Sequence, residues 1–441
     1  MHSPVRFLRW SLPPQPLALL SLCSVLSAAP HVQAALPMSQ AGAASALPTP
    51  ETVTPSALEW QEIPALLEKQ PALRALRLQQ QAAQLDARAA QRLPDPSVGV
   101  SVYEAHVNLS SIPLMLEAAQ AIPLHGRLKL EADMAQLAPE MQAQAQERLR
   151  RLLLAEARRA FALARETQQS TLVMKETRER LQQLRLTTQQ RLETGSSMLM
   201  DLLKLDEAIA RLQHEQLDMQ QELQMARAQL ASLLNLPVEQ LPELGKLPPL
   251  PRLSWERLEP HLLQQQPMLE ELKLAQQEAK LQEALTRTNY APELMVRGAY
   301  MLELGGMNMW SLGAMVQVPL QARGRQLPQQ EAARLRSESI THQQEAERLN
   351  LLREGRMNLI RLEQAHRHLQ LHDEQLMPLA QKMVETTLAA YQNGTGKLDE
   401  VLNTLTMRRM HHQERERFLR EGHQALAMLE AMTGPLEGDL P

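Results

Sequence analysis

The sequence predicts a mainly α-helical chain with a small β part, in which a strand hairpin followed by a long helical hairpin occurs twice. Three observations lead to this. Leu, Ala, Gln, Glu and Arg dominate the 441 residues, and aromatic residues make up only 2%, which is typical of long helices that pack side by side. Short segments alternate apolar and polar residues with the period of a strand. Prolines and glycines recur at matching places in the two halves, which indicates a duplicated unit.

Residues 1–34 have the pattern of a secretory signal peptide. Two arginines precede the short apolar core LALLSLCSVLSAA, and small residues lead to a cleavage site after Ala34. Cys23 raises the question of a lipid anchor, although Leu22 stands where lipoprotein signals have a small residue. Export is therefore expected. Residues 35–55, rich in Pro, Ala, Ser and Thr, are expected to form a flexible lead-in.

Composition and motifs also exclude several classes of function. The net charge of −4 gives no strongly basic surface, so nucleic acid is not an expected partner. Beyond the signal, no apolar run is long enough to cross a membrane as a helix. The chain shows no nucleophile–base constellation, phosphate loop or metalloprotease motif, so we expect neither an enzyme nor a bound cofactor.

The two predicted copies are residues 56–236 and 254–433. They are joined by the Pro-rich linker 237–253, and a tail of residues 434–441 follows. Each copy is expected to contain a helix, which in the first copy covers 56–92, then a strand hairpin, then a helical hairpin. The strand hairpins are predicted over 97–122 and 293–318, and the helical hairpins over 124–235 and 320–432.

Paired prolines and glycines mark the equivalent points of the two copies. Pro96 and Pro123 are separated as Pro292 and Pro319 are, and they bracket the two strand hairpins. Within the helical hairpins the turns read RLETGSSMLMDLL and AYQNGTGKLDEVL. Glycine readily takes left-handed backbone angles and is poor inside a helix, so these segments predict tight turns. The matching positions are Gly195 with Gly394, Leu199 with Leu398, and Asp201 with Glu400.

The predicted strands each have one apolar and one polar face. Their apolar positions are Val98, Val100 and Val102 in the first, Leu294, Val296, Tyr300 and Leu302 in the third, and Trp310, Leu312, Ala314, Val316 and Val318 in the fourth. Gln120 interrupts this face in the second strand. A half-buried hairpin of a soluble protein remains the alternative. However, strands of about 9 to 11 residues also have the length that crosses a bilayer at a tilt.

Four strands predict an assembly. An open sheet cannot lie in hydrocarbon, because its edges leave backbone groups unpaired. Closing a barrel takes at least about eight strands. Three copies of the chain would supply twelve, with polar faces toward a lumen and apolar faces toward lipid.

The predicted helices are too long for an ordinary globule. Residues 124–191 would reach about 100 Å as one helix, and residues 320–390 would match them. Pro139 and Pro378 are expected to kink them, and Gly355 is a rare glycine inside them. Apolar residues at helical spacing favour packing against a returning helix. A soluble bundle or filament-like coiled coil is the alternative, but it explains neither the strands nor their matching lengths.

These features resemble the TolC-like family of outer-membrane efflux ducts over most of the chain. The first turn is similar to the family's Arg-aromatic-x-x-Gly tip, with Arg191 and Gly195 present and Leu192 in place of the aromatic residue. The second resembles its Tyr-x-x-Gly tip, with Tyr391 and Gly394 present. The resemblance is nearest to members that serve metal-extruding pumps. Metal cations are therefore a permitted substrate class, but the sequence does not show that they are the substrate.

The resemblance implies a homotrimer in the outer membrane of a Gram-negative cell, with a twelve-stranded β-barrel continued by a periplasmic α-helical barrel. A periplasmic adaptor (membrane fusion protein) and an inner-membrane RND-type pump would dock at the inner end. The docking tips would comprise Arg191, Gly195, Ser196, Leu199, Tyr391, Gly394, Thr395, Gly396 and Leu398. Asp201 and Glu400 would form acidic rings at the pore constriction, which favour cations; solvated helix starts are the alternative.

The sequence also departs from the family pattern. Some members carry an Arg that helps to lock the closed end where this chain has Gly396. Aromatic residues for a membrane girdle are sparse, with Tyr103, Tyr300 and Trp310 the main candidates.

Histidines and methionines offer a weak signal for metal binding. His368 and His372 are four residues apart on one predicted helix face and could share a metal, but no third ligand is placed, so we expect them to face solvent. His411 and His412 point in different directions on a helix. The 23 methionines are expected to be packing residues, and no metal site is predicted.

Two other functions compete with the duct. A periplasmic adaptor also uses a long helical hairpin, but it would need one hairpin with flanking β-domains. A coiled-coil scaffold would have no lipid-facing strands.

Overall fold

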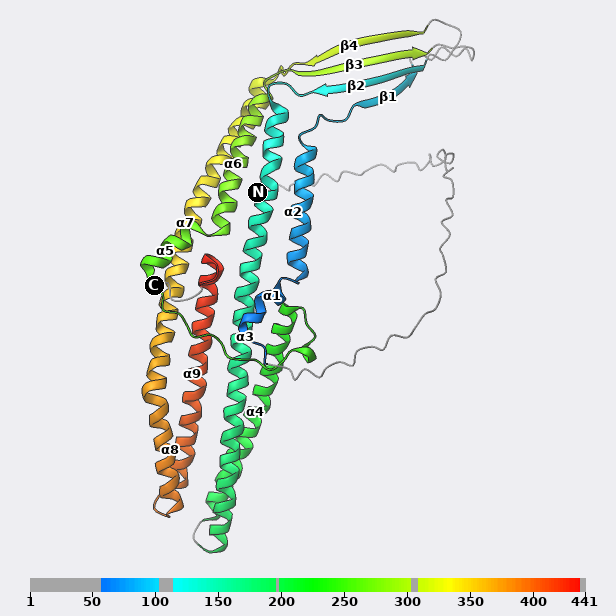
Figure 1. Ribbon diagram of the computed structural model, residues 1–441. Helices are drawn as coiled ribbons and strands as arrows, with labels where there is room; N and C mark the ends of the chain where they lie inside the picture. Colours follow the sequence, from blue (N-terminus) through cyan, green and yellow to red (C-terminus); the bar gives the residue numbers. More distant parts are fainter. Residues whose placement is uncertain (1–56, 103–113, 196–197, 303–307, 437–441) are drawn as a thin grey trace, which may run out of the picture. The chain divides into compact units, whose positions relative to one another are not determined.

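The computed structural model describes residues 57–102, 114–195, 198–302 and 308–436 (Figure 1). All of them belong to one compact unit of the chain. The predicted signal peptide with Cys23, the lead-in 35–55, most of the tail, Tyr103 and Ser196 lie outside the described residues.

The first half contains short helical segments, two strands and a long helical hairpin. In order these are η1 (Trp60–Glu62), α1 (Ile63–Leu67), α2 (Pro71–Ala89), β1 (Ser97–Val102), β2 (Leu114–Ile122), α3 (Arg127–Glu193) and α4 (Leu199–Leu234). The expectation of one helix over 56–92 is wrong, because the chain leaves the helix before Pro71. Proline disfavours helical angles in the residue before it and is best placed in the first turn, where α2 has it.

The second half runs through η2 (Val238–Gln240), α5 (Trp255–Gln264), α6 (Pro267–Thr288), β3 (Glu293–Leu302), β4 (Met309–Gln317), η3 (Ala322–Gln326), α7 (Leu327–Leu371), η4 (His372–Leu376), α8 (Met377–Gln392) and α9 (Leu398–Thr433). The segments η3 and η4 are wider, π-helical turns that directly precede helices with proline in the first turn, Pro328 and Pro378. A proline crowds the carbonyl four residues earlier, and a wider turn relieves this. By contrast, α3 is continuous through Pro139.

The four strands form one antiparallel sheet in chain order, β1-β2-β3-β4, and lie side by side in Figure 1. Directly opposite residues share a face of the sheet, and one such row runs through Val100, Leu116, Tyr300 and Trp310. The valines, leucines, isoleucine and aromatic residues of all four strands therefore lie on one face, whereas five methionines lie on the other: Met115, Met295, Met301, Met309 and Met315. Gln120 lies on it opposite Val296.

This apolar face is uncovered in the single chain. Val98 is 77% exposed, Trp310 is 78% exposed, and every residue of β4 is exposed. The opposite face carries serines and an ion pair between Arg297 and Glu117. The sheet thus presents an apolar surface on one side and a mixed surface of polar residues and methionines on the other.

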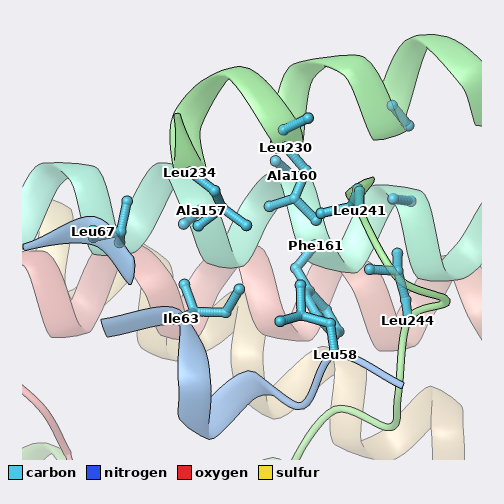
Figure 2. Close-up of a cluster of buried hydrophobic side chains, with 13 residues drawn as sticks. Leu58, Ile63, Leu67, Ala157, Ala160, Phe161, Leu230, Leu234, Leu241 and Leu244 are labelled. Atoms are coloured by element: carbon cyan, nitrogen blue, oxygen red, sulfur yellow. The ribbon is translucent and has the colours of Figure 1, made fainter. Parts of the chain in front are cut away.

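A core between the middle of α3 and the C-terminal end of α4 includes the linker between the halves. Phe161 of α3 is buried with Leu58, Leu230, Leu241 and Leu244, as Figure 2 shows. The N–H of Leu58 donates to the Glu243 carbonyl at 2.8 Å, and the N–H of Gly245 donates to the Leu58 carbonyl at 3.0 Å. The linker 237–253 is therefore part of the packed structure.

A second core lies between α5, α7 and α9. Here Gly355 of α7 allows close approach, because a Cβ at this position would lie 2.5 Å from Cδ1 of Leu262 in α5. This contact explains the rare glycine within a long helix.

No helix in the described part of the chain combines the length and the apolar character that a membrane crossing needs.

Candidate functional site at the two glycine turns

The second helical hairpin turns at Gly394, which takes the left-handed φ of 78°. The Ala390 carbonyl accepts hydrogen bonds from the N–H of Thr395 at 3.0 Å and of Gly396 at 2.9 Å. It also accepts from the Thr395 hydroxyl at 3.1 Å. These bonds satisfy the Ala390 carbonyl, one of those that the end of a helix leaves without an intrahelical partner.

The first hairpin turns in the same way at Gly195, with a φ of 75°. Its N–H donates to the Leu192 carbonyl at 3.0 Å, and the N–H of Thr194 donates to Gln190 at 3.3 Å. Both glycines therefore occupy the conformation that the sequence predicts for them.

Arg191 joins the two turns. Its Nη1 donates to the backbone carbonyl of Tyr391 at 2.7 Å, and its guanidinium lies 5.3 Å from the centre of the Tyr391 ring. The Tyr391 hydroxyl shares a buried hydrogen bond of 3.0 Å with the Thr188 hydroxyl of α3. The Arg and Tyr of the two tips thus form one contact between the hairpins.

An exposed ion pair adds to this connection. Nζ of Lys204 in α4 lies 2.7 and 2.8 Å from the carboxylate oxygens of Asp399 in α9. Neither Lys204 and Asp399 nor Thr188 could be found from the sequence, since a contact between distant helices leaves no local pattern.

Matched apolar positions of the two tips have opposite environments. Leu199 is 59% exposed beside Met198, which is 74% exposed, whereas Leu398 is 3% exposed. Leu398 and Tyr391 belong to a core cluster that also contains Val401. These two predicted docking residues therefore have little surface to offer a partner.

Gly396 packs against its own turn. A Cβ here would lie 2.9 Å from the Tyr391 nitrogen and 3.0 Å from the Ala390 carbonyl carbon. A side chain would displace backbone atoms, so the family's Arg does not fit this turn as it is built.

The predicted constriction acids occupy equivalent places. Asp201 is in the first turn of α4 and half-buried, and Glu400 is in the first turn of α9 and exposed. No ion pair to Glu400 occurs within the described ranges. Both acids lie where the helix dipole favours negative charge.

The expectation that His368 and His372 face solvent is wrong for His372, which is 3% exposed. Its ring faces His411 of α9, with the ring centres 5.7 Å apart. His368 instead stacks on Phe418 at 4.1 Å. The spacing along one helix does not show that α9 supplies these neighbours.

No protein-family model matches the sequence, and no curated protein matches it. Solved structures do match the fold. A membrane protein from Pseudomonas aeruginosa has a TM-score of 0.74, 17% sequence identity, and coverage of 85% of this chain and 90% of that chain. The outer membrane protein VceC from Vibrio cholerae has a TM-score of 0.70 and 14% identity, covering 86% and 97%. CusC, whose structures concern folding and transmembrane channel formation, has a TM-score of 0.70 and 18% identity, covering 85% and 92%.

The chain has the TolC-like fold. The identities are low, so the likeness concerns architecture, and it covers nearly the full length of the structures compared. The resemblance to the TolC-like family that the turns and strands indicate is therefore confirmed at the level of the fold. In the TolC-like fold of this chain, the strands and the glycine turns lie at opposite ends of α3, which spans 67 residues and hence about 100 Å.

Proposed function

We propose that the chain is the outer-membrane exit duct of a tripartite efflux system, a passive homotrimeric channel located in the outer membrane and the periplasm. It would carry substrates from an inner-membrane RND-type pump and a periplasmic adaptor to the exterior. Metal cations are one permitted substrate class. The observation that carries the proposal is the sheet, whose valines, leucines and aromatic residues from all four strands lie on one uncovered face.

The sheet supports both the membrane and the trimer. Hydrocarbon is the environment that suits an apolar face in which Val98 and Trp310 are more than three-quarters exposed. Among the described strands, β1 and β4 are edges, and a bilayer does not tolerate unpaired edges. Pairing β1 of one copy with β4 of the next in a ring of three would close a twelve-stranded barrel.

The polar face would then line the lumen. Arg297 and Glu117 form their ion pair on this face, with Ser97, Ser101 and Ser311. Such residues suit a water-filled passage and are unfavourable against lipid.

The glycine turns suit the docking of an adaptor. The exposed parts of the tips are Gly195 and Leu199 in the first hairpin and Gly394 and Thr395 in the second. Tyr391 and Leu398 would act indirectly, by holding the turns in shape from the core. Asp201 and Glu400, three copies of each, would contribute negative charge at the constriction and favour cations.

An adaptor or a coiled-coil scaffold is less well supported. The chain has two helical hairpins, and a scaffold gives no reason for an apolar sheet face of this extent.

A matched pair of variants tests the proposal. Leu312 and Ser311 are neighbours in β4 with side chains on opposite faces. Leu312→Arg would place a charge in lipid, which destabilises a barrel by about 2–4 kcal/mol near the membrane centre. Ser311→Arg would place the same charge in the lumen. Both are compared with the unaltered chain for recovery in the outer membrane, mass in detergent, and conductance in planar bilayers.

We expect the unaltered chain and Ser311→Arg to form trimers that conduct, with altered ion selectivity in Ser311→Arg. Leu312→Arg should be lost from the membrane fraction. Asp201→Asn with Glu400→Gln should reduce cation selectivity, whereas Asp218→Asn, on the exposed surface of α4, should not. A monomer that needs no detergent and gives no conductance would contradict the duct.

A further inference from the structure

Three potential metal ligands meet where the second helical hairpin changes its helical geometry. His372 is the first residue of the π-helical turn η4, between α7 and α8 (Figure 1). His411 and Glu414 lie on α9, and their spacing of three residues puts them on one helix face. Single π turns inside helices are frequent at functional sites.

The ligand atoms are close together. One from each of the three side chains lies within 4.8 Å of the other two. Oε2 of Glu414 is 3.5 Å from Nδ1 of His411 and 3.9 Å from Nε2 of His372. Ligands at 2.0–2.1 Å from a tetrahedral Zn²⁺ are about 3.4 Å apart, so small side-chain rotations would suffice.

The cluster is largely buried, and one of its nitrogens is unsatisfied. His372 is 3% exposed. Nδ1 of His411, which lies 3.5 Å from Glu414, has no hydrogen-bond partner among the described residues. Leaving a buried polar atom unpaired is destabilising, and a bound cation would relieve this. His368 and Phe418 stack on each other beside the cluster, so the His368 ring is already in use.

The surrounding charges leave the site open to a cation. Asp373 is held by Arg415 at 2.6 and 3.4 Å. One carboxylate, that of Glu414, remains for the cluster.

We propose that His372, His411 and Glu414 form a binding site for a divalent transition-metal ion, with Zn²⁺ the best match. Two imidazoles and one carboxylate, with a fourth position for water, are a ligand set that Zn²⁺ adopts in proteins. Mg²⁺ and Ca²⁺ prefer oxygen ligands and fit less well. The ion would join α9 to η4 and so brace the second hairpin. This site does not rest on the proposed function as a duct.

Zinc binding by the purified full chain tests the site. The metal-free protein in detergent is titrated with Zn²⁺ against a chromophoric chelator, and its thermal midpoint is recorded with and without Zn²⁺. The variants are His411→Gln and Glu414→Gln, which change partly exposed side chains and so preserve the fold. The control is His214→Gln on α4, where an exposed His lies 3.7 Å from the Asp218 carboxylate.

We expect one tight Zn²⁺ per chain in the unaltered protein and in His214→Gln, and a thermal midpoint that rises with Zn²⁺. Either variant at the site should weaken binding by at least about tenfold and abolish the rise. Co²⁺ should give the intense visible absorption of a four-coordinate ion in the unaltered protein and in His214→Gln, but not in the two variants at the site. Equal Zn²⁺ affinity in all four proteins, or none in the unaltered chain, would overturn the proposal.

Discussion

The hydroxyl groups of Tyr391 and Thr188 share a buried hydrogen bond of 3.0 Å, although the residues lie 203 positions apart. Tyr391 stands three residues before the glycine of the second turn, and Thr188 lies in the last two turns of α3, before the first turn. The bond therefore fixes one tip against the other from inside the structure. Arg191 secures the same pair of helices through the Tyr391 carbonyl.

Removing this bond should destabilise the tips. Tyr391→Phe deletes one hydroxyl and leaves the hydroxyl of Thr188, which is 0% exposed, without its partner across the hairpins. We expect the free energy of unfolding to fall by about 1–3 kcal/mol. The thermal midpoint in detergent measures this, with Tyr290→Phe, a half-exposed tyrosine, as the control. Equal midpoints for the two variants would contradict the role given to the bond.

The ion pair between Lys204 and Asp399 should matter much less. Their side chains are 39% and 58% exposed, and exposed pairs contribute about 0–1 kcal/mol. Asp399→Asn should therefore shift the thermal midpoint only slightly, and less still at high salt. A fall in the thermal midpoint as large as that caused by Tyr391→Phe would contradict this expectation. It would show that the surface ion pair is the main connection between the tips.

Gly394 gives a sharper test of backbone geometry. A residue with a side chain costs about 1–2 kcal/mol at the left-handed φ of 78°. A Cβ would also lie 3.3 Å from Nη2 of Arg191. We expect Gly394→Ala to lower the thermal midpoint, while Gly324→Ala, with open space around it and no left-handed φ, leaves it unchanged. An unchanged midpoint in both would mean that the turn tolerates other conformations.

Local patterns in the sequence predicted the features that depend on local geometry. Alternation along each strand assigned the apolar positions to one face, and the register aligned Leu116, Tyr300 and Trp310 across the sheet. The left-handed turns followed from Gly195 and Gly394, since glycine takes such angles most readily. These predictions needed no knowledge of which helices are neighbours.

What the sequence could not predict depends on neighbours far along the chain. Leu199 and Leu398 occupy matching positions, yet only Leu398 meets a core formed by other helices. In the same way, His372 acquires its candidate partner Glu414 only when α9 packs beside η4. Periodicity shows which face of a helix is apolar, but it does not identify the helix that covers it.

A further buried histidine predicts how stability depends on pH. His423 of α9 is 0% exposed, and burial together with repulsion from Arg158 lowers its pKa to about 3. Between the ordinary value of 6.5 and about 3, the unfolded chain binds a proton that the folded chain does not. The stabilising contribution is thus complete above pH 6.5 and is lost as the pH falls through this window, at up to about 1.4 kcal/mol per pH unit.

His423→Leu should remove this contribution, because leucine binds no proton in either state. We expect the thermal midpoint of the unaltered chain to fall more steeply on acidification from pH 6.5 than that of the variant. The slope is the measurement, so a constant offset from altered packing does not affect it. His214→Leu, at an exposed position on α4, should keep the steep slope. Parallel curves for the unaltered chain and His423→Leu would mean that His423 is not held neutral by the fold.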